Sequence, residues 1–148
     1  MPSVFLSPSL QEYNPYVNGG NEEYYMNLIA DEMVPILTSS GIEVGRNSPE
    51  QTLSQAIAQS NAGNYNLHLA IHSNAAPPSN AGNVKGADIY YSAASSQGTR
   101  AATIFANNYK LIYPYPELVK TIPTTSLAEI VRTKAPAILI EVGKSGQA

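Results

Sequence analysis

The chain has 148 residues and a formal net charge of −3 at pH 7, with 43% hydrophobic and 13% charged residues. This length fits one domain that can bury a core, and the composition is that of a globular chain rather than a disordered one. Lys and Arg are scattered under a net negative charge, which argues against nucleic-acid binding. The absence of Cys excludes disulfides, thiolate catalysis and cysteine zinc sites.

No apolar stretch approaches the roughly 20 residues that cross a membrane. Residues 1–8 read Met-Pro-Ser-Val-Phe-Leu-Ser-Pro and lack the basic and long apolar segments of a signal peptide. A protein of this sequence that works outside the cell therefore needs an export signal not seen here, or another route such as lysis.

Apolar runs alternate with stretches of helical periodicity. A buried strand is predicted at 3–7, followed by a loop at 10–20. Asn21 then caps a helix with acids in its first turn and Gly41 just past its end. Further strands are predicted at 42–46, 67–71, 87–91 and 136–142, and helices from Ser48 to near Gly63 and over 95–112. The segments 73–85 and 113–125 are predicted to be mostly loop, and 127–132 is ambiguous between strand and helix.

This order predicts a single α/β domain over residues 1–148, with three layers: a mainly parallel twisted sheet and helices on both faces. Such sheets bind ligands at the carboxyl ends of their strands. His72 follows the strand at 67–71, Glu141 lies near the end of the last strand, and Glu23 opens the helix after the first strand. We therefore expect these three side chains on one rim of the sheet.

Imidazole and carboxylate groups suit zinc, and hydrolytic zinc sites usually combine three protein ligands with a water molecule. Glu23 and His72 are the candidate ligands, and Glu141 is the candidate general base that takes the proton of the water. The spacing alone is only suggestive, because the chain has no close-spaced motif such as His-Glu-x-x-His.

Five segments resemble, in the right order, motifs of the zinc-dependent N-acetylmuramoyl-L-alanine amidase family. They are Val-Phe-Leu-Ser-Pro at 4–8, Glu-Glu with Met-Asn-Leu-Ile-Ala at 22–30, Ile-His-Ser-Asn at 71–74, Gly-Ala-Asp-Ile-Tyr-Tyr-Ser at 86–92 and Pro-Ala-Ile-Leu-Ile-Glu-Val-Gly at 136–143. The resemblance implies an amidase/phosphorylase-like α/β fold and a Zn²⁺ cofactor. By position, Glu23, four residues before Asn27, and His72 match zinc ligands, and Glu141 matches the catalytic glutamate.

The implied reaction is hydrolysis of the amide between N-acetylmuramic acid and L-alanine in peptidoglycan. The resemblance also implies an extracellular or cell-wall location. It leaves the roles of autolysin, spore-wall enzyme and phage endolysin open.

Two departures from the family pattern stand out. Leu10 occupies the place of a zinc histidine after the first strand, and the sequence ends at Ala148, where the family usually continues with another helix. The first departure motivates an alternative function, a catalytically inactive domain that binds cell wall or a protein partner. The second predicts a shortened domain or a sequence that ends early.

Four other residues are candidates for the missing place or for substrate contacts. His68 lies four residues before His72, about 13 Å along a strand, which is too far for both to bind one zinc ion. We therefore predict that His68 is a buried structural residue. Gln11 is a candidate weak ligand or water-holding group, and Asn74 and Arg132 are candidate substrate contacts.

Overall fold

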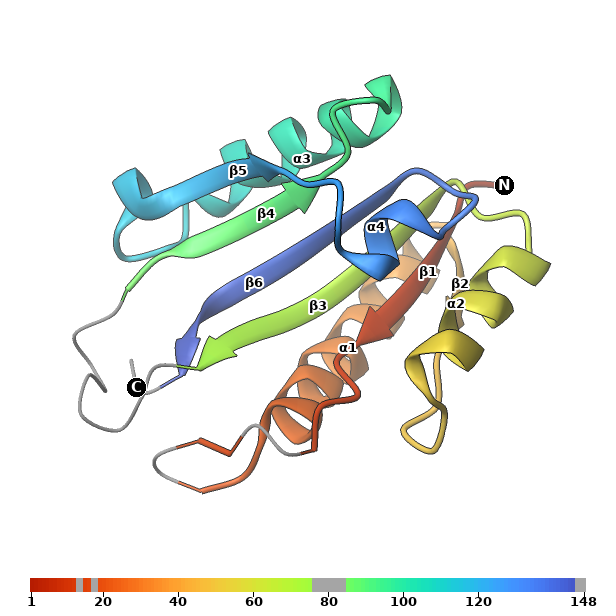
Figure 1. Ribbon diagram of the computed structural model, residues 1–148, viewed down its shortest axis with the longest axis horizontal. Helices are drawn as coiled ribbons and strands as arrows, with labels where there is room; N and C mark the ends of the chain where they lie inside the picture. The colour runs from red at the N-terminus through yellow and green to blue at the C-terminus, as the bar shows by residue number, and fades with distance from the viewer. Residues whose placement is uncertain (13–14, 17–18, 76–84, 146–148) are drawn as a thin grey trace.

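A six-stranded sheet forms the middle layer of the computed structural model, which describes residues 1–12, 15–16, 19–75 and 85–145 (Figure 1). The strands run in the order β2-β1-β3-β6-β4-β5. Their bounds are β1 Ser3–Pro8, β2 Glu43–Arg46, β3 Leu67–Ala75, β4 Ala87–Tyr91, β5 Val119–Pro123 and β6 Ala137–Ser145. Neighbours are parallel except β4 and β6, so β4 and β5 run against the other four strands. The mainly parallel sheet is thus confirmed.

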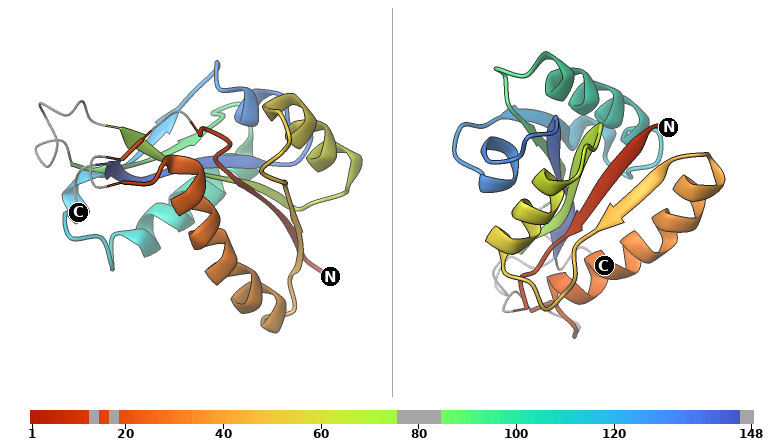
Figure 2. Two further views of the ribbon diagram at one scale, coloured as in Figure 1. Left: turned by 90° about the horizontal axis from the view of Figure 1, so that it is seen from below. Right: turned by 90° about the vertical axis from the view of Figure 1, so that its right-hand side faces the viewer.

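Helices cover both faces of this sheet (Figure 2). Helices α1 (Glu22–Ser39) and α3 (Ser96–Tyr109) pack on one face, and α2 (Leu53–Ala62) and α4 (Ala128–Val131) lie on the other. The larger apolar cluster joins the sheet to α1 and α3, and a smaller one joins Ile130 of α4 to Ala70 and Leu139. The three-layer α/β fold follows directly from this division of the core.

The start of α1 is as the sequence predicts. The Asn21 side chain accepts a hydrogen bond of 2.8 Å from the backbone N–H of Tyr24, and Glu22 and Glu23 occupy the first turn. Gly41 follows the helix with φ of +80°, a conformation that glycine adopts without strain. The Asn21 cap fixes Glu22 and Glu23 at the edge of the sheet where β1, β3 and β6 end.

The predicted start of the second helix at Ser48 is wrong. Gln51 does accept from the backbone N–H of Ser48 at 2.8 Å, but residues 49–51 form a turn. The helix begins after Thr52, whose side chain forms a reciprocal capping box with Gln55. Two overlapping capping patterns occur in sequence, and only the second leads into a helix.

The structure also changes the predictions for two segments expected to be loop and settles one that was ambiguous. Segment 113–125 contains a 3₁₀ turn at Pro116–Leu118 and the edge strand β5, where Pro123 is tolerated because it is the last strand residue. Strand β3 runs on to Ala75, beyond the predicted end at residue 71. Segment 127–132 forms the short helix α4.

The register of three strands positions the site. His72 of β3 pairs with Glu141 of β6, and Glu141 pairs with Asp88 of β4. Beyond this row, β3 advances from His72 to Asn74 while β6 advances from Glu141 to Lys144, so β6 holds one extra residue there. In the described part of the chain, no helix has the length and apolar character needed to cross a membrane.

Candidate active site

One face of the sheet, the face covered by α2 and α4, carries a connected set of polar side chains. Alternation along a strand places residues two apart on the same face, so His68 and His72 of β3 share it, and register adds Glu141 beside His72. The sequence analysis expects His72 and Glu141 on one rim, and the register pairs the two residues on neighbouring strands. Their strands lie about 4.8 Å apart, as neighbouring strands do.

Both ring nitrogens of His72 face a carboxylate. Nδ1 lies 2.9 Å from Oε2 of Glu22 at the start of α1, and Nε2 lies 2.9 Å from Oε2 of Glu129 on α4. Glu22 and Glu129 are 1% and 4% exposed, whereas the His72 side chain keeps 14% of its surface open to solvent. His72 therefore bridges two helices that lie on opposite faces of the sheet.

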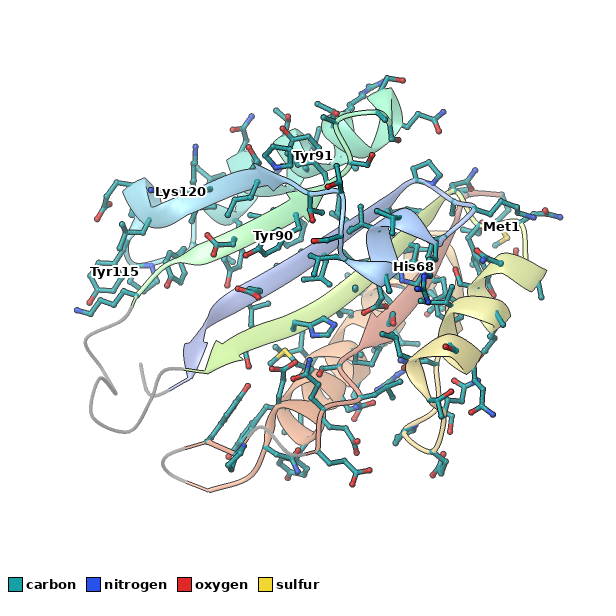
Figure 3. The ribbon with its side chains drawn as sticks, in the orientation of Figure 1. Met1, His68, Tyr90, Tyr91, Tyr115 and Lys120 are labelled. Carbon is teal, nitrogen blue, oxygen red and sulfur yellow. The ribbon has the colours of Figure 1, made fainter. Side chains whose placement is uncertain are left out.

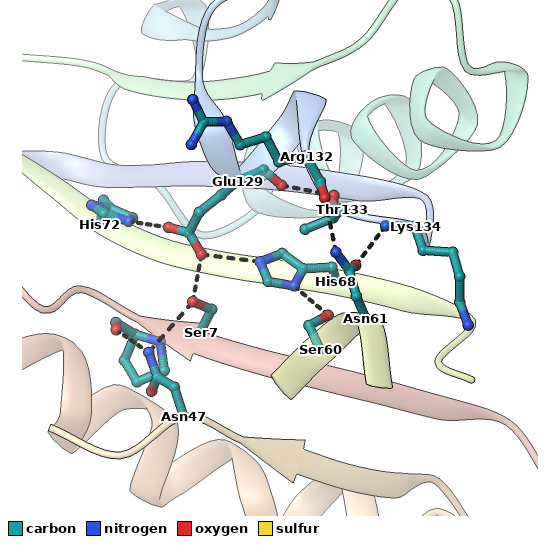
Figure 4. Close-up of polar contacts among 11 residues, drawn as sticks. Ser7, Asn47, Ser60, Asn61, His68, His72, Glu129, Arg132, Thr133 and Lys134 are labelled. Atoms are coloured by element: carbon teal, nitrogen blue, oxygen red, sulfur yellow. Dashed lines mark hydrogen bonds and ion pairs between the residues drawn. The ribbon is translucent and has the colours of Figure 1, made fainter. Parts of the chain in front are cut away.

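Glu129 is the residue that sequence reasoning missed. Its Oε1 accepts from Nε2 of His68 at 3.0 Å and from the hydroxyl of Ser7, while Oε2 binds His72. Figure 4 shows the two histidines on either side of this carboxylate. Because Glu129 lies on a single helical turn far from its partners in sequence, no local sequence pattern predicts its role.

His68 is a buried structural histidine, as predicted from its spacing. Its side chain is fully buried, Nδ1 lies 2.9 Å from Oγ of Ser60 and Nε2 binds Glu129. The Ser60 hydroxyl can donate to Nδ1, which leaves the proton of a neutral ring on Nε2, facing Glu129. Each ring nitrogen of His68 thus has a hydrogen-bond partner.

The His72–Glu129 pair shifts both pKa values. Burial by itself would lower the pKa of His72, but the hydrogen bonds and charges of Glu129 and Glu22 outweigh it and raise the pKa to about 9. Burial would raise the pKa of Glu129, but hydrogen bonds from His68 and His72 lower it to about 2. At neutral pH and without metal, His72 is therefore an imidazolium held between carboxylates.

This charge state predicts a pH dependence of stability in the metal-free protein. His72 has a folded-state pKa of about 9 against 6.5 in the unfolded chain, so its contribution is full below pH 6.5 and is lost as pH rises through 9. The shift corresponds to about 3 kcal/mol of unfolding free energy. Urea unfolding with a chelator at pH 6 and pH 9.5 should show this loss in the wild type. The His72→Gln variant should show a smaller loss, and equal losses in both proteins would contradict the assignment.

The two glutamates of the first α1 turn face different surroundings. Glu22 is buried against His72, whereas Glu23 lines a separate cavity of about 540 Å³ with Asn27, Arg46 and other residues. Burial, together with the charges of Glu12 and Glu50, raises the pKa of Glu23. The structure brings Glu22, not Glu23, into contact with His72, and the ligand role of Glu23 stays a prediction.

Glu141 lies half-buried in the row between His72 and Asp88. Burial raises the pKa of the Tyr90 hydroxyl, and the charge of Glu141 adds to this rise. Tyr90 packs against the cluster under α4, and Figure 3 shows it on β4. Glu141 thus lies beside His72 on the face of the sheet that carries α4, but both strands run on to Ala75 and Ser145, so the two residues lie inside their strands and not at the expected rim.

A cavity of about 250 Å³ opens beside His72 and Glu129. Leu10 and Gln11 form one wall, and the start of α2 forms another. Gln11 therefore lies near His72, as the sequence suggests for a candidate shell residue. Arg132 ends α4 and is exposed, and its backbone carbonyl accepts from Asn61 at 2.9 Å. The side chain of Asn74 lies outside the described part of the structure.

The His72–Glu22 pair fits two positions of a zinc shell. Donors bound at about 2.0–2.2 Å in tetrahedral geometry lie roughly 3.3 Å apart. Nδ1 of His72 and Oε2 of Glu22 are 2.9 Å apart, so they offer two donor atoms of the right kind at nearly that separation. Within the described residues, no three His, Asp or Glu side chains gather to hold a metal, and Leu10 contributes no donor.

Comparisons with known proteins agree with this architecture. A family model described as N-acetylmuramoyl-L-alanine amidase matches residues 9–145. The fold is similar to that of the N-acetylmuramoyl-L-alanine amidase AmiC2 of Nostoc punctiforme, with a TM-score of 0.77, 18% identity and coverage of 97% of this chain and 80% of that one. No curated protein matches the chain.

Two further solved structures share the fold. An N-acetylmuramoyl-L-alanine amidase from Clostridium difficile 630 has a TM-score of 0.79 and 17% identity, covering 98% of this chain and 81% of that one. The catalytic domain of the CD27L endolysin targeting Clostridia difficile has a TM-score of 0.77 and 18% identity, covering 99% and 83%. At these identities the structures establish the fold, and the family match establishes the relationship.

Proposed function

The chain belongs to the N-acetylmuramoyl-L-alanine amidase family, and from this premise we propose that it hydrolyses the amide between N-acetylmuramic acid and L-alanine in peptidoglycan. The observation that supports the proposal is the contact of Glu22 with His72, together with the pairing of Glu141 with His72 on the neighbouring strand. Its substrate is a cell-wall polymer, so we propose that it acts at the cell wall.

Nδ1 of His72 and a carboxylate oxygen of Glu22 would hold a Zn²⁺ ion. When bound, zinc lowers the pKa of a coordinated water towards about 7 and polarises a substrate carbonyl. The resemblance assigns the carboxylate role to Glu23, but the contact of 2.9 Å with His72 favours Glu22. Two protein ligands hold zinc less tightly than three, so we expect weak binding that is lost during purification.

Glu141 would act as the general base. A carboxylate next to the water-binding position takes a proton from the attacking water and passes it to the leaving amine. The half-buried position of Glu141, paired with His72 on the neighbouring strand, supports this role. Gln11, on the cavity wall with His72, would contact substrate or the water shell, and Asn74 and Arg132 remain candidate substrate contacts.

A second candidate function is an inactive amidase-like domain that binds cell wall or a protein partner. Leu10 favours it, because this residue lines the cavity beside His72 without offering a metal donor. Glu22 and Glu129 contact both ring nitrogens of His72, so the ring has its partners without a metal ion. The two candidates differ in whether zinc binds and whether amide bonds are cut.

Zinc uptake and amide cleavage test the proposal together. The wild type, Glu22→Gln and Glu23→Gln are titrated with zinc in chelator-free buffer, and then assayed for new L-alanine amino termini on purified peptidoglycan with zinc supplied. We expect Glu22→Gln to lower both zinc affinity and amide cleavage by at least tenfold. Glu23→Gln should keep both, because the contact with His72 comes from Glu22.

The two variants serve as matched controls, since each removes one charge from the same helix turn. Loss in Glu23→Gln alone would return the ligand role to the residue assigned by resemblance. A wild type that takes up no zinc and releases no amino termini would leave the binding-domain function standing and remove the enzyme proposal.

A further inference from the structure

Glu129 is anchored independently of His72. Its Oε1 accepts from His68 at 3.0 Å and from the hydroxyl of Ser7, which itself lies 3.4 Å from Nδ2 of Asn47. His68 is in turn held by Ser60. The carboxylate is therefore fixed by β1 and β3 before His72 is considered, and Oε2 remains to meet the His72 ring.

The helix that carries Glu129 is also tied down. Ile130 packs into the apolar cluster under α4, and the Thr133 hydroxyl donates to the backbone carbonyl of Glu129 at 2.9 Å. Asn61 of α2 bridges the chain beyond the helix, donating to the carbonyl of Arg132 at 2.9 Å and accepting from the N–H of Lys134 at 2.7 Å. A helix of one turn is thereby given a fixed position against β3 and β6.

Proton bookkeeping then fixes the role of each His72 nitrogen. Oε1 of Glu129 accepts from the Ser7 hydroxyl and contacts Nε2 of His68, so Oε2, which lies 2.9 Å from Nε2 of His72, is the oxygen left to accept from that ring. The Nε2 of His72 therefore carries hydrogen. In a ring with one proton, this leaves the Nδ1 lone pair directed at Glu22, 2.9 Å away.

We propose that Glu129 is a positioning residue: by accepting the Nε2–H of His72 it holds the ring so that Nδ1, beside Glu22, is the metal-binding nitrogen. The proposal rests on the proposed zinc-dependent function. Carboxylates that accept the second N–H of a metal-binding histidine orient the ring and strengthen the ligand, and their loss costs about 10–100-fold in metal affinity. Here the carboxylate comes from α4, and β1 and β3 hold it in place.

Two conservative variants separate the effect of the side-chain length of Glu129 from the effect of its charge. Glu129→Asp keeps the charge near His68 and Ser7 but withdraws the carboxylate from His72 by one methylene group. Glu129→Gln keeps the reach and offers one oxygen to the Nε2–H of His72, while its amide N–H₂ faces His68. His68 can accommodate this by changing tautomer, because the Ser60 hydroxyl can accept as well as donate.

The experiment measures zinc affinity by chelator competition and, in the metal-free protein, the protected ring N–H signal of His72 by proton NMR. We expect Glu129→Asp to lose the Nε2–H signal and to bind zinc about 10–100-fold more weakly. Glu129→Gln should keep the signal and stay within a few-fold of the wild type. Ile130→Val, which loosens packing under α4 without touching the carboxylate, controls for stability.

The opposite order, with Glu129→Gln weaker than Glu129→Asp, would show that charge rather than hydrogen-bonded orientation matters and would overturn the proposal. Equal affinities and equal ring signals in all variants would overturn it too. If the wild type binds no zinc, the zinc function fails. The ring signal still decides whether Glu129 holds His72, because it is read without metal.

Discussion

Replacing Glu141 by Gln is expected to lower amide cleavage of peptidoglycan by about 10²–10⁴-fold, the usual worth of a general base. The amide side chain has nearly the same shape but takes no proton from water. Because Glu141 lies in the strand position beside His72 and is not in the His72–Glu22 contact, zinc affinity should stay unchanged. Release of L-alanine amino termini from purified peptidoglycan, at saturating zinc, measures the effect.

Asp88→Asn is the matched control for this substitution. Asp88 pairs with Glu141 on the side opposite His72. The substitution therefore removes a charge from the same row of residues, one strand further from His72. We expect this variant to keep most of the activity. If Glu141→Gln released as much product as the wild type, Glu141 would have no part in the mechanism.

Replacing Leu10 by His is expected to tighten zinc binding by about 100-fold. Losing a group that only hydrogen-bonds to a metal ligand weakens zinc binding by up to about 100-fold, and a direct ligand should contribute at least as much. Leu10 is half-buried on the wall of the cavity that His72 also lines, so an imidazole there can reach the same space. Three protein ligands are the usual number for a hydrolytic zinc ion. Chelator competition gives the affinity directly.

Leu10→Asn controls for polarity, because a neutral amide is a poor zinc ligand beside imidazole. It should leave the zinc affinity near that of the wild type. If the His and Asn variants bound zinc equally, residue 10 would lie outside the metal shell, and the weak affinity of the chain would need another cause.

Much of the site follows from the sequence because strand order is an effective guide in parallel sheets. The apolar runs at 67–71 and 136–142 predict strands whose carboxyl ends share an edge, and the register pairs His72 with Glu141, although both strands run further than predicted. Spacing along one strand is equally informative for His68. Its place four residues before His72 rules out a shared ion and predicts the buried, hydrogen-bonded residue that the structure shows.

The choice between Glu22 and Glu23 could not be made in the same way. Both residues suit the first turn of a helix, and the dipole favours both equally. Successive helix residues point about 100° apart, so one turns to His72 and the other to the cavity beside Arg46. Only the packed helix shows which is which.

Glu129 escaped prediction for a different reason. The segment around it is one helical turn, too short for a periodic pattern, and its sequence is ambiguous between strand and helix. Its partners Ser7, His68 and His72 lie 122, 61 and 57 residues away in the chain. The edge strand β5 was missed because only Val119 is buried, which leaves no alternating apolar pattern to read.

The extra residue in β6 separates Glu141 from the end of the strand. Up to the pair His72–Glu141 the two strands advance together, but from Glu141 to Lys144 β6 uses three residues where β3 uses two. The extra residue therefore lies after Glu141 and leaves the pairing of Glu141 with His72 and Asp88 unchanged. The register that sets Glu141 beside His72 is thus determined by the five consecutive pairs from His68–Ala137 to His72–Glu141, all of which come before the shift.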